Sequence, residues 1–172
     1  SLKALDEIRA DIGFLFQGSA LYDSMTVREN LEFPLRRHIS KFGNVKDTLP
    51  LVEEALQNVG LKNVIDLMPN ELSGGMKRRV ALARTLILKP KIIIYDEPTT
   101  GLDPITSKEI ILLMKSVQEK YKTSSIIITH DVDCARVIAN RMILLIDGKN
   151  YAEGTFAELS TSQDPKVKAF FK

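Results

Sequence analysis

Two adjacent carboxylates, Asp96 and Glu97, have the residue types and the position for catalysis. They follow the apolar run Ile92–Ile94, which predicts a buried parallel strand that ends at the carboxylates. Ligands of α/β proteins bind at this end of the strands. One carboxylate could therefore hold Mg²⁺ while the other orients a water molecule, although such pairs also occur as simple caps of a following turn. The residues that come next, Pro98–Asp103, favour the catalytic interpretation.

The segment Leu72–Met76 predicts a phosphate-binding site. Its two glycines let backbone N–H groups approach an anion, the Ser73 hydroxyl adds a donor, and the helix expected to begin here adds its positive dipole end. The basic residues Lys77–Arg79 then fall in the first helical turn, where positive charge is disfavoured unless an anion is near. They indicate either a ligand or pairing with neighbours such as Glu71, and taken alone they favour the pairing.

The usual phosphate-cradling loop is missing from these 172 residues. Nine glycines are present, yet none stands in a Gly-x-x-x-x-Gly-Lys-Ser/Thr arrangement. The chain therefore resembles an ATP-hydrolysing half-site without its own P-loop.

The elements that must position these residues alternate between strand and helix, which predicts an α/β fold with a parallel sheet and right-handed crossovers. A helical block from about Thr26 to Leu88 is inserted after the first strand. Turn residues at Asp147–Asn150 predict a short hairpin, and the tail predicts two short helices. The expected strands are Ile12–Phe16, Ile92–Tyr95, Ser125–Thr129 and Arg141–Ile146, and the expected helices are Leu2–Ala10, Val27–Leu31, Val45–Val59, Ser73–Leu88, Pro104–Tyr121 and Val132–Ala139.

Composition limits the function classes only weakly. The chain has 24 Lys and Arg against 22 Asp and Glu, and this net charge of +2 argues for neither nucleic acid nor an anionic membrane. Cys134 is the only cysteine, which excludes an internal disulfide, fits a cytosolic location and suggests a small core residue. The apolar runs are too short for a membrane-spanning helix, and His38 receives no role.

The motifs, in this order, resemble the nucleotide-binding (ATPase) subunit of ATP-binding cassette (ABC) transporters, whose fold is of the P-loop NTPase type. The resemblance covers essentially the whole chain. The matching segments are Gln17 for the Q-loop, Leu72–Met76 for the signature, Ile92–Glu97 for the Walker B strand, Gly101–Asp103 for the D-loop and Thr129–Asp131 for the switch-histidine loop. It implies one partial ABC ATPase domain over residues 1–172, with a helical subdomain at 24–88 and the Walker B, D-loop and switch-histidine part at 89–172.

The resemblance also implies catalytic and metal-binding roles. Glu97 would be the general base and His130 would contact the γ-phosphate, while Asp96 and Gln17 would serve Mg²⁺, Gln17 also sensing the permease. Taken alone, Gln17 could equally be a satisfied amide at a strand end, and His130 a structural hydrogen bonder. The shared spacing favours function for both.

Four further residues would bind nucleotide or join subunits. The resemblance implies that Ser73, Gly74 and Gly75 contact the γ-phosphate of ATP bound to the opposite subunit, with Asp103 at the dimer interface. A second ATPase subunit is therefore an expected partner.

Within this family, three segments are similar to the ATPase subunit of bacterial Mla-type phospholipid transporters: Phe16–Val27, Leu72–Arg79 and Gly154–Pro165. That similarity implies a membrane permease and an MCE-type lipid-binding protein as partners, and no nucleic acid. It also implies a peripheral location on the cytoplasmic face of the inner membrane, held there by the permease.

The sequence departs from the family pattern in two ways that should affect nucleotide binding. Met76 stands where many ABC proteins have Gln, which removes a polar contact. The family's Walker A loop would precede Ser1, so we expect an N-terminally truncated domain that alone neither binds Mg-ATP tightly nor hydrolyses it. We also expect apolar surface to be exposed where the absent elements would pack, favouring self-association.

Two alternatives remain. A non-transport ABC ATPase acting on DNA or ribosomes would carry a coiled coil or a second cassette, and the chain has no sustained heptads. A P-loop-less interaction module would instead lend its Ser73–Gly75 face to a partner's ATP site.

Overall fold

The computed structural model describes residues 2–38 and 47–171. They form two compact units, Ser1–Ile128 and Thr129–Lys172, each of which is described by itself. The division falls after Ile128, and the boundary of the helical subdomain at residue 88 stays a prediction. The predicted start of a helix at Val45 lies outside the described residues.

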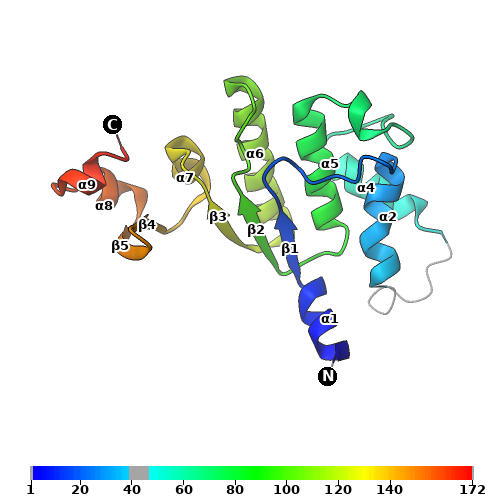
Figure 1. The fold of residues 1–172 in the computed structure, drawn as a ribbon, viewed down its shortest axis with the longest axis horizontal. Coiled ribbons are helices and arrows are strands. Elements are labelled where there is room, and N and C mark those ends of the chain that lie inside the picture. The colour runs from blue at the N-terminus through cyan, green and yellow to red at the C-terminus, as the bar shows by residue number, and fades with distance from the viewer. Residues whose placement is uncertain (1, 39–46, 172) are drawn as a thin grey trace. The chain divides into compact units, whose positions relative to one another are not determined.

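The first unit contains a three-stranded parallel sheet in the order β1-β2-β3 (Figure 1). Its strands are β1 (Ile12–Leu15), β2 (Ile92–Asp96) and β3 (Ser124–Ile128). Leu15 pairs with Tyr95, so β1 and β2 end at the same edge. These three strands confirm the parallel sheet expected from the apolar runs.

One face of this sheet is packed against helix α5 (Gly74–Leu86). Leu15 and Tyr95 are buried on that face. Gly13 lies there too, and a Cβ at this position would stand 2.6 Å from Thr85 Cγ2, so only glycine permits the approach. The strands therefore meet α5 at close range.

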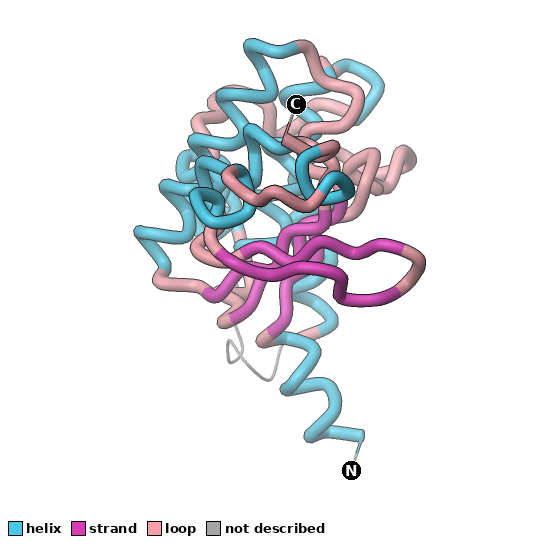
Figure 2. The backbone as a smooth tube through the Cα atoms, turned by 90° about the vertical axis from the view of Figure 1, so that its left-hand side faces the viewer, coloured by secondary structure: helices cyan, strands magenta, loops and turns pink. Residues whose placement is uncertain are grey.

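The opposite face carries exposed apolar side chains, although parallel sheets are ordinarily covered on both faces. Exposed apolar surface was expected from the sequence, whereas the packing of absent elements on this face and self-association through it stay predictions. The exposed side chains are Ile12, Phe14, Ile92, Ile126 and Ile128. Helix α1 (Leu2–Ala10) leads into β1 and extends away from the sheet (Figure 2).

Helix α2 (Val27–Arg37) runs well past the predicted end at Leu31. Val27, Leu31 and Leu35 recur every four residues and are all buried, which continues the apolar stripe. Pro34 inside the helix removes one backbone donor without ending it. Thr26 and Glu29 form a capping box at the start of α2.

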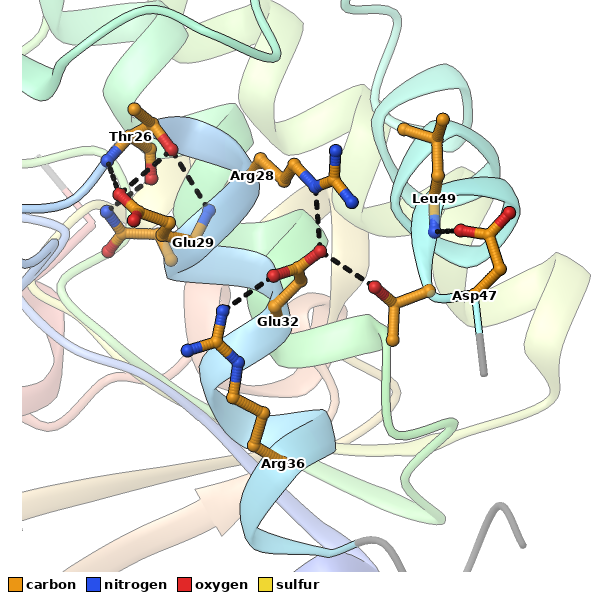
Figure 3. Close-up of polar contacts among 9 residues, drawn as sticks. Thr26, Arg28, Glu29, Glu32, Arg36, Asp47 and Leu49 are labelled. Carbon is orange, nitrogen blue, oxygen red and sulfur yellow. Dashed lines mark hydrogen bonds and ion pairs between the residues drawn. The ribbon is translucent and has the colours of Figure 1, made fainter. Parts of the chain in front are cut away.

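Glu32 joins α2 to the start of helix α4 (Leu49–Asn58). Its carboxylate accepts hydrogen bonds from Arg28 Nε, Arg36 Nη2 and Thr48 Oγ1, each 2.7 Å long (Figure 3). Burial alone raises the pKa of Glu32, but these three donors outweigh it and lower the pKa to about 2. The charge is thus satisfied within the helical block itself.

Among its described residues, 2–38 and 47–128, the first unit also contains the short helix η1 (Pro69–Glu71) and helix α6 (Pro104–Tyr121). Helix α6 has the predicted bounds because Asp103 caps its start and Lys122 ends it in the left-handed conformation. Helix α6 links β2 to β3 as the crossover of a parallel pair.

The second unit contains one antiparallel hairpin and three helices among its described residues, 129–171. Its elements are α7 (Val132–Ile138), β4 (Met142–Ile146), β5 (Lys149–Gly154), α8 (Phe156–Ser160) and α9 (Pro165–Lys168).

The prediction that Arg141–Ile146 joins the parallel sheet is wrong. Strand β4 pairs with β5 in an antiparallel hairpin, whose turn at Asp147 and Gly148 has φ values of 52° and 72°. Positive φ at both turn residues matches the twist of a tight hairpin, so the local turn selects the partner strand. Leu144 then packs in a small core, which also contains Leu159 and Val167.

Candidate functional site

The carboxyl ends of β1 and β2 bring Gln17 and Asp96 to one edge of the sheet. Asp96 is the last residue of β2, Gln17 follows β1 closely, and the register pairs Leu15 with Tyr95. Gln17 is exposed and Asp96 is half-buried. The two residues predicted to serve Mg²⁺ therefore share one edge.

The loop that follows Gln17 is held by a hydrogen bond from helix α5. Gly18, Ser19 and Ala20 all have positive φ, an uncommon conformation for the last two. Arg84 of α5 donates from Nη2 to the Ser19 carbonyl at 3.1 Å. Burial lowers the pKa of Arg84. The sequence reasoning missed Arg84, because helical spacing does not show where a long side chain ends.

Glu97 adopts a left-handed backbone conformation with φ 47°. Its N–H donates to the Ile128 carbonyl at 2.9 Å, which extends the β2–β3 ladder, and its Oε2 accepts the Thr100 hydroxyl at 3.0 Å. A non-glycine residue in this region costs about 1 kcal/mol or more, and such strain is concentrated at functional sites. Six other non-glycine residues among those that the structure describes also have positive φ, so this conformation does not by itself mark Glu97 as functional.

Ser73 is the N-cap of α5, as the sequence predicted. Its Oγ accepts the N–H of Met76 at 3.2 Å, and Gly74 and Gly75 form the first turn. Ser73 and Gly74 are exposed. The turn therefore presents backbone N–H groups and the positive end of a 13-residue helix to solvent.

The loop containing Asp103 lies beside the Ser73 turn. A Cβ on Gly74 would stand 3.6 Å from a Leu102 methyl, and one on Gly75 would stand 2.7 Å from Thr106 Cγ2. Asp103 accepts the Thr106 hydroxyl at 2.5 Å and the N–H groups of Ile105 and Thr106 at 3.0 Å. These hydrogen bonds, led by that from the Thr106 side chain, lower the pKa of Asp103.

His130 belongs to the second unit, and its role beside the other candidates stays a prediction. It is exposed and directly precedes Asp131, which caps α7 by accepting the Cys134 N–H at 3.0 Å. Cys134 is fully buried, which confirms it as a small core residue.

The side-chain oxygens at the sheet edge suit Mg²⁺ only if a bound phosphate supplies further oxygens. Among residues 2–38 and 47–171, no three His, Cys, Asp or Glu residues converge as a metal cage. Mg²⁺ commonly takes one or two protein oxygens and completes its octahedron with phosphates and waters. Asp96 and Gln17 fit that pattern.

In the same described residues, no helix is long and apolar enough to cross a membrane.

Comparison with known proteins identifies the family. Residues 2–100 match the family described as ABC transporter. The chain belongs to the ABC transporter family. This confirms the resemblance stated from the sequence.

Similar proteins include transport ATP-binding subunits. The intermembrane phospholipid transport system ATP-binding protein MlaF of Haemophilus influenzae is 41% identical over 172 residues, which are all of this chain and 64% of MlaF. The probable ribonucleotide transport ATP-binding protein mkl of Mycobacterium leprae is 39% identical over 170 residues, 99% of this chain and 48% of mkl. The chain thus spans less than two thirds of either protein.

A solved structure confirms the α/β fold. A dimeric ATP-binding cassette in a post-hydrolysis state, bound to ADP and Pi, aligns with a TM-score of 0.77 and 35% identity. The alignment covers 91% of this chain and 68% of that one. That cassette therefore shares the α/β architecture described above.

Proposed function

We propose that this chain forms part of the ATP-hydrolysing subunit of an ABC transporter that moves phospholipid. The observation that carries the proposal is the gathering of Gln17, Asp96 and Glu97 at one sheet edge. The Thr100 hydroxyl, which donates to Glu97 Oε2 at 3.0 Å, supports the same conclusion because it fixes the carboxylate. Similarity to MlaF along the whole chain supports phospholipid as the transported substrate.

Each residue then has a distinct task. Glu97 accepts a proton from the attacking water, and the Thr100 hydroxyl orients its carboxylate. Asp96 would hold Mg²⁺ through water, and Gln17 would add an amide oxygen. Mg²⁺, when bound, neutralises the charge that develops on the transferred phosphoryl group. His130 contacts the γ-phosphate.

The Ser73 turn acts on ATP held mainly by a second subunit. Its exposed N–H groups and helix dipole suit a γ-phosphate, and Asp103 beside it lies at the contact between subunits. Two copies therefore form two ATP sites. The dimeric cassette with ADP and Pi supports this arrangement.

The wider assembly contains a membrane permease and an MCE-type lipid-binding protein. The subunit sits at the cytoplasmic face of the inner membrane and is held there by the permease. The 172 residues on their own do not hydrolyse ATP, since none of them forms the glycine-lysine loop that contacts the β- and γ-phosphates.

The test uses the complete gene product, purified together with its permease. Mg²⁺-dependent ATP hydrolysis is measured with phosphatidylglycerol and phosphatidylethanolamine vesicles, and separately with a ribonucleoside monophosphate mixture. We expect hydrolysis that EDTA abolishes and that the vesicles stimulate. Stimulation by the ribonucleotides alone would replace phospholipid with the substrate class that the name of mkl gives, and the absence of hydrolysis would overturn the proposal.

A matched arm tests the isolated chain. The 172 residues are mixed with the complete gene product carrying Ser73→Glu, which blocks its own phosphate-binding turn. Hydrolysis that appears only on mixing would favour the interaction-module alternative for this chain, whereas hydrolysis by the 172 residues alone would contradict their predicted inactivity.

A further inference from the structure

Arg78 is a buried cation close to the candidate site. It lies near the start of α5 and is 3% exposed. Burial lowers the pKa of its guanidinium. Among the residues that the structure describes, no carboxylate lies within ion-pair distance of Arg78, and its Nε has no hydrogen-bond partner. Burial of such a charge costs free energy that its hydrogen bonds must offset, so the partners of those hydrogen bonds indicate what this arginine does.

The two hydrogen bonds of Arg78 go to two loops of the site. Nη1 donates to the Phe16 carbonyl at 2.9 Å, and Nη2 donates to the Thr100 carbonyl at 3.2 Å. Phe16 directly precedes Gln17, and Thr100 directly precedes the loop Gly101–Asp103. A single planar guanidinium therefore fixes the spacing between these loops and helix α5, which Ser73 caps.

The connection continues to Glu97. The Thr100 hydroxyl donates to Glu97 Oε2 at 3.0 Å, and the Thr100 N–H donates to the Glu97 carbonyl at 3.3 Å. A shift of Thr100 would therefore move the carboxylate. Small displacements of a catalytic group are costly, since about 1 Å can reduce the rate roughly a hundredfold.

We propose that Arg78 is a positioning residue that holds the Gln17 loop and the Thr100–Asp103 loop in register with α5, and that sets Glu97 through Thr100. The inference rests on the proposed ATPase function. Lysine cannot replace Arg78, because an ammonium group lacks the rigid fork that reaches two diverging carbonyls.

The neighbouring Arg79 is a matched control. It also belongs to α5, but it donates to the Val59 carbonyl at 2.9 Å and pairs with Glu109 at 2.9 Å. Neither partner belongs to a loop of the site. Comparing variants of the two arginines therefore distinguishes an effect on the positions of the loops from an effect on the stability of α5.

The experiment compares Arg78→Met, Arg78→Lys and Arg79→Met in the complete gene product. Methionine keeps an apolar stem and removes the buried charge, so the urea midpoint of Arg78→Met should equal or exceed that of the wild type. We expect its kcat to fall at least about tenfold while KM for ATP changes less than about twofold. Arg78→Lys should not restore kcat, and Arg79→Met should keep it within about twofold.

Hydrogen exchange supplies a readout that does not depend on hydrolysis. Amides of residues 16–19 and 100–103 should exchange at least about tenfold faster in both Arg78 variants, and at the wild-type rate in Arg79→Met. Unchanged exchange in a folded Arg78 variant overturns the proposal. If Arg78→Met does not fold, Arg78→Lys decides by the same measurement. A wild-type protein without ATPase activity would overturn the proposed function, while the exchange result would still decide the role of Arg78.

Discussion

An acidic residue in the helical block and one at the carboxyl edge of the sheet have different surroundings. In the block, Glu32 is buried and takes three donors from its own surroundings. At the edge, Glu97 sits on a left-handed backbone and its carboxylate takes the Thr100 hydroxyl. The contacts of Glu32 indicate a role in stability, whereas the role that we propose for Glu97 is in hydrolysis.

The largest expected effect is on hydrolysis at the edge. Glu97→Gln in the complete gene product should lower kcat by roughly 10²- to 10⁴-fold, because an amide cannot accept the proton of water. ATP binding and the urea midpoint should stay close to the wild type. Glu119→Gln, an exposed change on α6, is the control. A stability loss without a kcat loss would reverse the contrast drawn above.

The second effect is on stability in the block. Glu32→Gln removes the charge that Arg28 and Arg36 share and should lower the free energy of unfolding by about 1 to 3 kcal/mol. The kcat of the folded fraction should not change. Denaturant titration beside the exposed Glu53→Gln measures the difference. Equal stability of the two variants would show that the Glu32 contacts contribute nothing.

The third effect is a pH dependence that belongs to Glu32. Its folded-state pKa is lowered from 4.5 to about 2, so the unfolded chain binds more protons between these values. The stabilisation is present above about pH 4.5 and is lost as the pH falls towards 2, by up to about 3 kcal/mol. The slope of unfolding free energy against pH in this window should be smaller in Glu32→Gln. Identical slopes would contradict the assignment to Glu32.

The smallest effect compares two neighbouring glycines at the edge. Gly75→Ala would place a Cβ 2.7 Å from Thr106 Cγ2, and we expect a loss of about 1 kcal/mol together with reduced kcat. Gly74→Ala meets Leu102 at an ordinary 3.6 Å, so alanine's helix propensity should leave stability equal or higher. Thermal unfolding of the pair decides, and an equal cost at both positions would weaken the packing argument.

Local signals in the sequence predicted much of the fold. Helix α6 matches its predicted bounds because Asp103, Pro104 and the left-handed Lys122 are all local. Strand β4 was predicted at nearly the right residues but assigned to the wrong sheet, since an apolar run does not specify its partner. Helix α2 was predicted too short, because Pro34 and the charged Glu32 obscured the stripe that reaches Leu35.

The sequence predicted the motifs of the candidate site but not the arginines that hold its loops. Ser73 and Asp103 cap helices through local contacts, and their positions follow from residue type. Arg78 and Arg84 reach carbonyls of the loop after β1, more than sixty residues earlier in the chain. Such contacts depend on tertiary packing, so no local pattern marks these two arginines. The functional roles of all the candidate residues, Gln17 and His130 included, remain predictions.

The central claim is that Glu97 of one subunit and the Ser73 turn of another complete one ATP site. The most direct measurement mixes two variants of the complete gene product, Glu97→Gln and Ser73→Glu, each inactive alone. Random pairing into symmetric dimers should restore about a quarter of the wild-type ATPase rate, because half of the dimers then contain one intact site. A mixture no more active than its components would contradict the claim.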